Sequence, residues 1–132
     1  MSDFPDPAST VRKFESGQIE AQHFDHEAHV YVAWCFVTQF TLADAIARFD
    51  NALRRVTDKL GVPEKYHATI TWFFLLLVAE RVDADEDWQS FRARNPDLFQ
   101  ESKATLERHY SAERLFSDAA RNHFLLPDRT PT

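Results

Sequence analysis

The chain of 132 residues has very little cysteine and glycine. Its single cysteine, Cys35, excludes an intramolecular disulfide and any metal site built from several cysteines. Two glycines, with no Asn-Gly or Asp-Gly pair, leave little of the turn chemistry that β-hairpins need. The composition therefore favours an all-α protein from a reducing compartment.

The sequence also lacks a long apolar run and an excess of basic residues. The longest apolar run, WFFLLLVA at 72–79, is too short to cross a bilayer, and the N-terminal segment MSDFPDPAST has no signal-peptide pattern. The net charge is −6, from 21 acidic and 15 basic residues, which disfavours binding to nucleic acid. We expect a cytoplasmic protein that binds neither membranes nor nucleic acid.

Apolar residues make up 44% of the chain, including twelve phenylalanines, so a packed core is expected. At this length we predict one domain over 1–132, frayed at about 1–9 and at about 127–132. The segments below are assigned within that domain.

Helical periodicity and capping residues predict three long helices. The first follows Asp25 and runs to about Gln39, the second opens at TLAD (41–44) and ends at Gly61, and the third extends from Pro63 to about Val82. The third is apolar nearly all round, which is typical of a central helix. Shorter helices are predicted at about 10–16, 86–94, 97–109 and 112–124. We therefore predict an antiparallel helical bundle with three long central helices and shorter C-terminal helices packed around them.

Three of the six histidines lie within seven residues, in HFDHEAHVYVAW at 23–34. Short connections would place the starts of the first and third long helices at the same end of the bundle. With a helical rise of about 1.5 Å per residue, His26, His29 and His67 would lie roughly 21, 16 and 19 Å above the turn near Thr41. The three rings are therefore predicted to converge, whereas His23 is expected in a loop.

Three converging imidazoles are a recurrent ligand set for divalent zinc, iron or copper. Such a metal could activate water or a substrate, with His67, Tyr66 and Thr71 as catalytic candidates. Because the positive ends of two helix dipoles meet there, the same residues also fit a metal-free pocket for an anion. A third alternative is that the histidines are structural, with partners inside the core.

Three motifs resemble a group of small, uncharacterised bacterial helical proteins. They are F-x-H-x-x-H at 24–29, K-Y-H-x-T-x-T at 65–71 and Y-S-x-E-x-L-x-S-x-x-A-R from Tyr110 to Arg121, followed by Pro127-Asp128. The resemblance implies no activity. The third motif could fold over the histidine end as a lid, with Tyr110 or Arg121 contacting a ligand.

We hypothesise a small protein whose His26, His29 and His67 form a pocket, with a metal, that binds or transforms a small polar metabolite. Whether it is an enzyme stays open. The alternative is a non-catalytic binding or adaptor module whose histidines are structural. Such a module could form a homodimer. Asp50, on the flank of the second long helix, could supply an oxygen ligand or orient a histidine, but we expect it to be solvated and of little consequence for stability.

Overall fold

The structure, a computed structural model, describes residues 6–18 and 25–129. Within these ranges the chain forms helices and short connections and no β-strand, so the all-α prediction is confirmed. The predictions for His23 and for Phe24 of the first motif lie outside the described residues.

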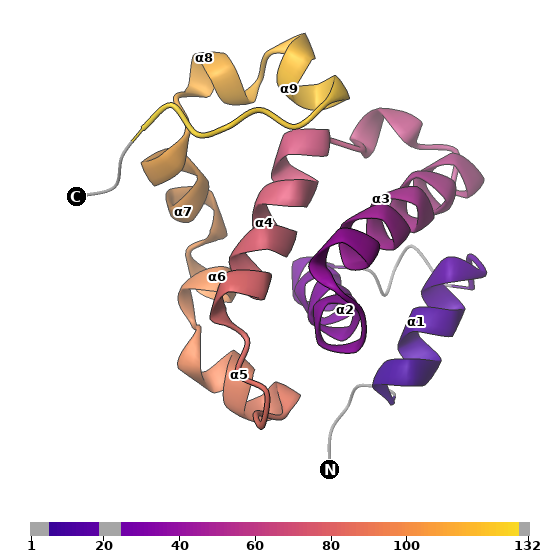
Figure 1. The fold of residues 1–132 in the computed structure, drawn as a ribbon. Coiled ribbons are helices and arrows are strands. Elements are labelled where there is room, and N and C mark those ends of the chain that lie inside the picture. The colour runs from indigo at the N-terminus through magenta and orange to yellow at the C-terminus, as the bar shows by residue number, and fades with distance from the viewer. Residues whose placement is uncertain (1–5, 19–24, 130–132) are drawn as a thin grey trace.

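Three helices are much longer than the others and adjoin one another (Figure 1). The elements are α1 (Pro7–Glu15), α2 (His26–Gln39), α3 (Leu42–Lys59), the 3-10 turn η2 (Pro63–Lys65), α4 (Ala68–Arg81), α5 (Trp88–Arg94), α6 (Asp97–Gln100), α7 (Ser102–His109), α8 (Ala112–Leu115) and α9 (Asp118–Asn122).

Side-chain caps explain where most of these helices start. Asp25 accepts a hydrogen bond from the backbone N–H of Ala28, and Thr41 accepts one from Asp44, as predicted for these two starts. Helix α1 begins at Pro7, earlier than the predicted start at about residue 10. Asp6 caps α1, and Pro7 suits the first helical position because it has no N–H to satisfy. The N-terminal end is thus helical from Pro7, within the stretch predicted to fray.

The third long helix starts later than predicted. Pro63 opens only the short turn η2, after which Tyr66 and His67 are extended and α4 begins at Ala68. His67 is therefore the N-cap of α4 and not a residue within it. The C-terminal helices are also more broken than predicted, because Glu101 separates α6 from α7 and Ser117 starts α9.

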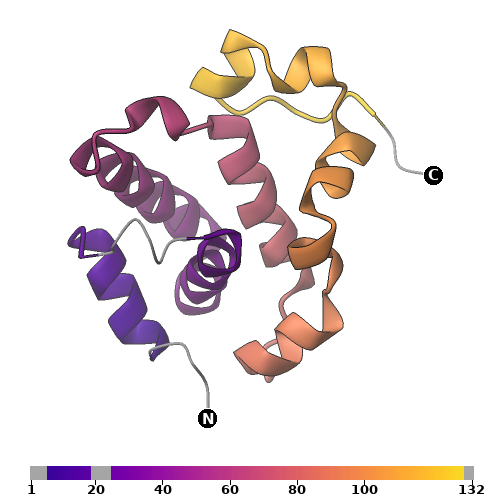
Figure 2. The same cartoon turned by 180° about the vertical axis from the view of Figure 1, so that it is seen from behind.

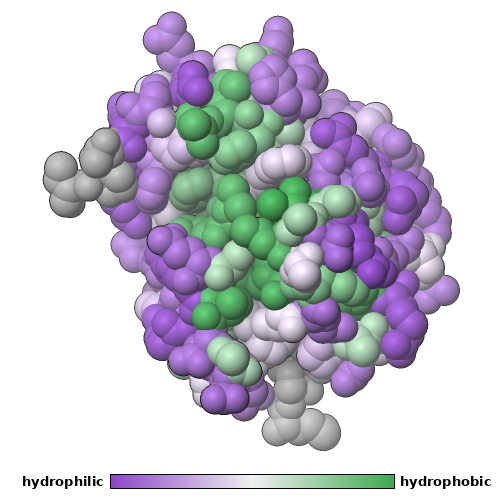
Figure 3. All heavy atoms as spheres, viewed as in Figure 1, coloured by the Kyte–Doolittle hydropathy of each residue, from purple (hydrophilic) through white to green (hydrophobic). Residues whose placement is uncertain are grey.

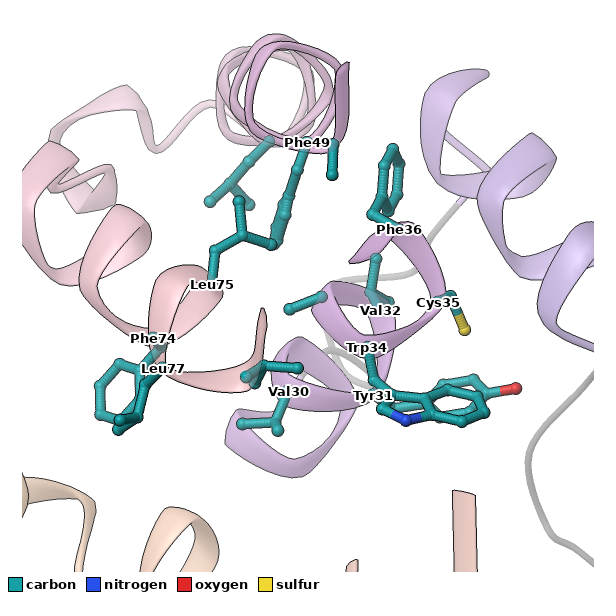
Figure 4. Close-up of a cluster of buried hydrophobic side chains, with 14 of the residues drawn as sticks. Val30, Tyr31, Val32, Trp34, Cys35, Phe36, Phe49, Phe74, Leu75 and Leu77 are labelled. Carbon is teal, nitrogen blue, oxygen red and sulfur yellow. The ribbon is translucent and has the colours of Figure 1, made fainter. Parts of the chain in front are cut away.

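Helix α2 is enclosed by other helices over much of its length. Seven consecutive residues, Val30 to Phe36, are buried, since α1, α3, α4 and α6 all contact this helix. Figure 4 shows Phe36 and Val32 of α2 close to Phe49 of α3 and Leu75 of α4. Helix α4 has eight buried residues, and its apolar surface is divided between α2 and the C-terminal helices.

The aligned bundle is not confirmed. Figure 1 views α2 nearly along its axis while α4 lies across the view, so these two helices cross. Seen from behind in Figure 2, α1 flanks α2 and α3 on one side, and α5 to α9 lie on the other side of α4. The chain thus forms an N-terminal group of helices and a C-terminal layer, α5–α9, with α4 between them.

Some apolar surface stays exposed. Figure 3 shows it near the centre of the face on which α3 and α4 lie. The large apolar side chains with the highest exposed fractions are Phe116 (73%) and Leu126 (69%), both in the C-terminal layer or just after it. Among the described helices, none is long and apolar enough to cross a membrane.

Replacing Phe74 by Ala should lower the free energy of unfolding by about 3 to 5 kcal/mol, because its ring is buried and packs edge-on against His26 and Phe73. Phe116→Ala is the matched control and should change stability by less than about 0.5 kcal/mol. Denaturant melts of both variants test this. Equal melting of the two would show that the buried face of α4 is wrongly assigned.

Candidate functional site

One pocket lies where α2 and α4 begin and α3 ends, and all three predicted histidines line it. Its volume is about 380 Å³. The wall is mostly apolar and comes from four segments: the start of α2, the C-terminal half of α3, the η2 turn and the first turns of α4. Its lining consists of Asp25, His26, His29, Leu53, Val56, Thr57, Leu60, Val62, Lys65, Tyr66, His67, Ile70 and Thr71.

Two of the histidines are bound to the C-terminal layer. The Nε2 of His26 lies 2.7 Å from the carbonyl oxygen of Leu98 in α6, and the Nε2 of His67 lies 2.7 Å from that of Leu115 in α8. Because a carbonyl oxygen can only accept, each Nε2 carries a proton and donates. Both rings therefore join a core helix to a short C-terminal helix.

His67 also uses its second ring nitrogen. Its Nδ1 accepts a hydrogen bond from the backbone N–H of Ile70 at 3.2 Å, which is the cap of α4. This arrangement requires a neutral ring, and burial lowers the pKa of His67 in the same direction, with the charge of Arg121 adding to the effect. His67 has no nitrogen left for a metal or a substrate in this conformation.

The donor set does not fit the predicted metal. In residues 6–18 and 25–129, no three His, Cys, Asp or Glu side chains come close enough together to hold an ion. His26, His29 and His67 cannot act together as ligands in this conformation, because both nitrogens of His67 are hydrogen-bonded and one nitrogen of His26 is protonated and donates to Leu98. The zinc, iron or copper centre stays a prediction, for which this geometry supplies no ligand set.

His29 lies deeper than His26, one turn further along α2, and its ring packs against Phe49 with centroids 5.3 Å apart. Burial, with a smaller contribution from nearby His26, lowers its pKa to about 4. His29 is therefore neutral at physiological pH, and its surroundings disfavour charge.

Tyr66 contributes its ring to the pocket but directs its hydroxyl elsewhere. The hydroxyl donates to Asp50, which also accepts from the indole N–H of Trp72 at 3.1 Å and from Arg54 at 3.0 Å. Burial and the hydrogen bond to Asp50 raise the pKa of Tyr66 above its usual value. The expectation of a solvated Asp50 is thus wrong, because this carboxylate connects α3 to the start of α4 and to Trp72.

Thr71 is the third predicted catalytic residue, and it lies on the pocket wall. Only 4% of its surface is exposed, and its hydroxyl forms no hydrogen bond to another described residue. Because no buried side-chain polar atom of the described residues is left without a partner, this hydroxyl is not sealed in the core but reaches the surface of the pocket. Thr71 is therefore a polar group available to whatever occupies the pocket.

The predicted ligand contacts Arg121 and Tyr110 do not line the pocket. Arg121 donates to the backbone carbonyls of Glu64 and Tyr66, and so fastens α9 to the η2 turn. Tyr110 is buried, packs edge-on against Phe73 and donates to the carbonyl of Leu125 at 2.6 Å. The third motif thus adjoins the histidine end as a structural layer, with neither residue facing the pocket.

Sequence reasoning missed the α3 wall and Lys65. Leu53, Val56 and Leu60 repeat at the helical spacing that is typical of a core face, and nothing in the sequence marks them as the wall of a pocket. Lys65 immediately precedes the Tyr66-His67 pair, and its position in that motif was the available signal. In the described parts of the chain it forms no ion pair.

Comparisons with known proteins add no assignment: no family model, curated protein or solved structure matches the chain. The function must therefore be inferred from the pocket itself.

His67→Ala should lower the free energy of unfolding by about 2 to 4 kcal/mol, since it removes the α4 cap and leaves the Leu115 carbonyl without its donor. His67→Asn loses the contact with α8 but keeps a good capping residue, so it should lower the free energy of unfolding by less than His67→Ala. Denaturant melts and amide exchange in α8 measure the two effects. His123→Ala, at an exposed ring, is the control, and a silent His67→Ala would contradict the structural role.

Acid should destabilise the fold through His29. Its folded pKa is about 4 and its unfolded value 6.5, so between these pH values the unfolded chain binds a proton that the folded state excludes. The free energy of unfolding should therefore fall as pH drops through this window, by up to about 3 kcal/mol. Above pH 6.5 this contribution is fully present. Melts of wild type and His29→Gln against pH test it, and identical slopes would refute it.

Proposed function

We propose that the pocket at the starts of α2 and α4 binds a small metabolite with an apolar body, and that the protein acts as a binding module. The observation that supports this most strongly is a pocket of about 380 Å³ that combines an apolar wall with the unpartnered hydroxyl of Thr71. Ligand pockets typically have this size and this mixture of an apolar wall and a few polar groups.

Binding is better supported than catalysis by the state of the histidines. His26 and His67 hold the C-terminal layer, and removing either ring from its carbonyl would expose a helix end. His29 has a pKa of about 4, far below the value near neutrality that makes an efficient general base.

We propose no role for a metal ion in this pocket, because both ring nitrogens of His67 are already hydrogen-bonded. Metal analysis of the untagged protein remains the direct test of the metal prediction. The adaptor hypothesis likewise stays a prediction, to be tested by the mass of the protein in solution; the exposed Phe116 and Leu126 would be its first candidates for mutation.

A fragment screen by ligand-observed NMR should yield binders that Thr57→Trp abolishes. Thr57 lines the pocket, and an indole there would occupy part of its volume. Thr38→Trp is a closely matched control, since both threonines lie on helices and donate to carbonyls three and four residues earlier, but Thr38 does not line the pocket.

Binders that survive Thr57→Trp would place ligand binding elsewhere. A screen with no binders to the folded protein would refute the proposed function. Thermal melts of both tryptophan variants must first show that each is folded, and Leu60→Trp, at a more exposed position of the wall, provides a second blocking variant if Thr57→Trp is not.

A further inference from the structure

We propose that the ligand is a small carboxylic acid with a hydroxyl group at the opposite end of an apolar body, bound with the hydroxyl against Thr71 and the carboxylate beside Lys65. This inference rests on the proposed function and names the ligand class. It follows from a difference in exposure and polarity between the two ends of the pocket.

The pocket has a buried end and an exposed end. Leu53 and Thr71, in the interior of α3 and α4, are 5% and 4% exposed, whereas Leu60, at the C-terminus of α3, is 38% exposed. Asp25 and Lys65 are both exposed. Asp25 immediately precedes α2, and Lys65 lies shortly before α4. The mouth is therefore formed by the helix ends, and the floor lies about one turn inside.

The buried end suits an uncharged polar group. The Thr71 hydroxyl has no partner in the described part of the chain, and a ligand hydroxyl could both donate to it and accept from it. His29 lines the same pocket, and its lowered pKa indicates that this region disfavours charge. A carboxylate or ammonium group at the floor would lose its hydration without a charged partner.

The middle of the pocket supplies an apolar wall for the ligand body. Leu53 and Val56 of α3 and Ile70 of α4 line it, and we propose that an aromatic ring or a short alkyl chain of the ligand contacts them. Contacts of this kind contribute affinity through burial of apolar surface.

The mouth favours an anion. Lys65 carries a charge that no described acidic residue pairs with, whereas Asp25, the one carboxylate of the lining, already caps α2 by accepting from Ala28 at 2.9 Å. The positive dipole ends of α2 and α4 are directed to the same place. Arg121, bound to the carbonyls of Glu64 and Tyr66, adds positive charge close to Lys65.

The test uses para-hydroxyphenylpropanoate as the probe, with calorimetry on the full chain. Phenylpropanoate lacks its hydroxyl, para-hydroxyphenylpropanol lacks its carboxylate, and tyramine replaces the anion with a cation. The acid should bind about fivefold more tightly than phenylpropanoate, from one hydrogen bond, and about threefold more tightly than the alcohol, from one exposed ion pair. Tyramine should bind most weakly.

Two variants assign each preference to its residue. Thr71→Val should abolish the preference for the hydroxyl and keep the preference for the carboxylate, and Lys65→Met should do the reverse. Thr38→Val and Lys103→Met, on exposed helix surfaces, should leave both preferences unchanged. These comparisons use ratios between ligands, so a modest loss of stability in a variant does not distort them.

The inference is overturned if tyramine binds as well as the acid, if either variant leaves both preferences intact, or if the acid does not bind while fragments that Thr57→Trp blocks do. In that last case the proposed function stands and only the ligand class is wrong. If no fragment binds the pocket at all, both proposals fail.

Discussion

Helices of four or five residues cannot satisfy their own carbonyl groups, and the C-terminal layer consists largely of such helices. The last four carbonyls of any α-helix lack an intrahelical donor. Because α6, α8 and α9 have only four or five residues each, nearly all of their carbonyls are in this position. The protein meets this constraint with donors from the core helices: His26 serves α6, His67 serves α8, and the buried hydroxyl of Thr69 lies 2.7 Å from the Ala120 carbonyl of α9. The layer is therefore held by polar contacts as much as by apolar packing.

These contacts also determine where the pocket lies. His67 must be extended at the start of α4 to reach both Ile70 and Leu115, so the chain cannot continue directly from η2 into a helix. The resulting break separates the η2 turn from α4 and leaves the end of α3 without a continuous neighbour. Leu60 and Val62 line the pocket at this point. A structural requirement of the C-terminal layer thus produces the opening in which we propose a ligand binds.

The sequence predicted the helical class and the caps of α2 and α3, because capping residues and helical periodicity are local signals. His26, His29 and His67 line one pocket, but they form no group of ligands among the described residues, so the predicted convergence of the three rings on one point is not confirmed. The sequence did not predict the crossing of α2 and α4, which depends on how their side chains interlock, nor the enclosed position of α2. The hydrogen-bond partners of His67 and Asp50 could not be predicted from the sequence either. A histidine ligand and a histidine that caps a helix have the same sequence signature, and only the nearby carbonyl of Leu115 distinguishes them.

The three motifs noted in the sequence therefore have a common physical explanation that does not require catalysis. His26, Thr69 and Tyr110 each contact a backbone carbonyl in a distant segment, and Ser111 binds Asp128 through both its N–H and its hydroxyl. Thr71 is the exception, because it belongs to the second motif yet contacts no described polar partner. If every polar residue of these motifs were needed only for folding, a valine would serve at 71 with the same shape and no unpaired hydroxyl. The hydroxyl of Thr71 borders the pocket and is used by no contact with another described residue, and this is the reason to look for a ligand there.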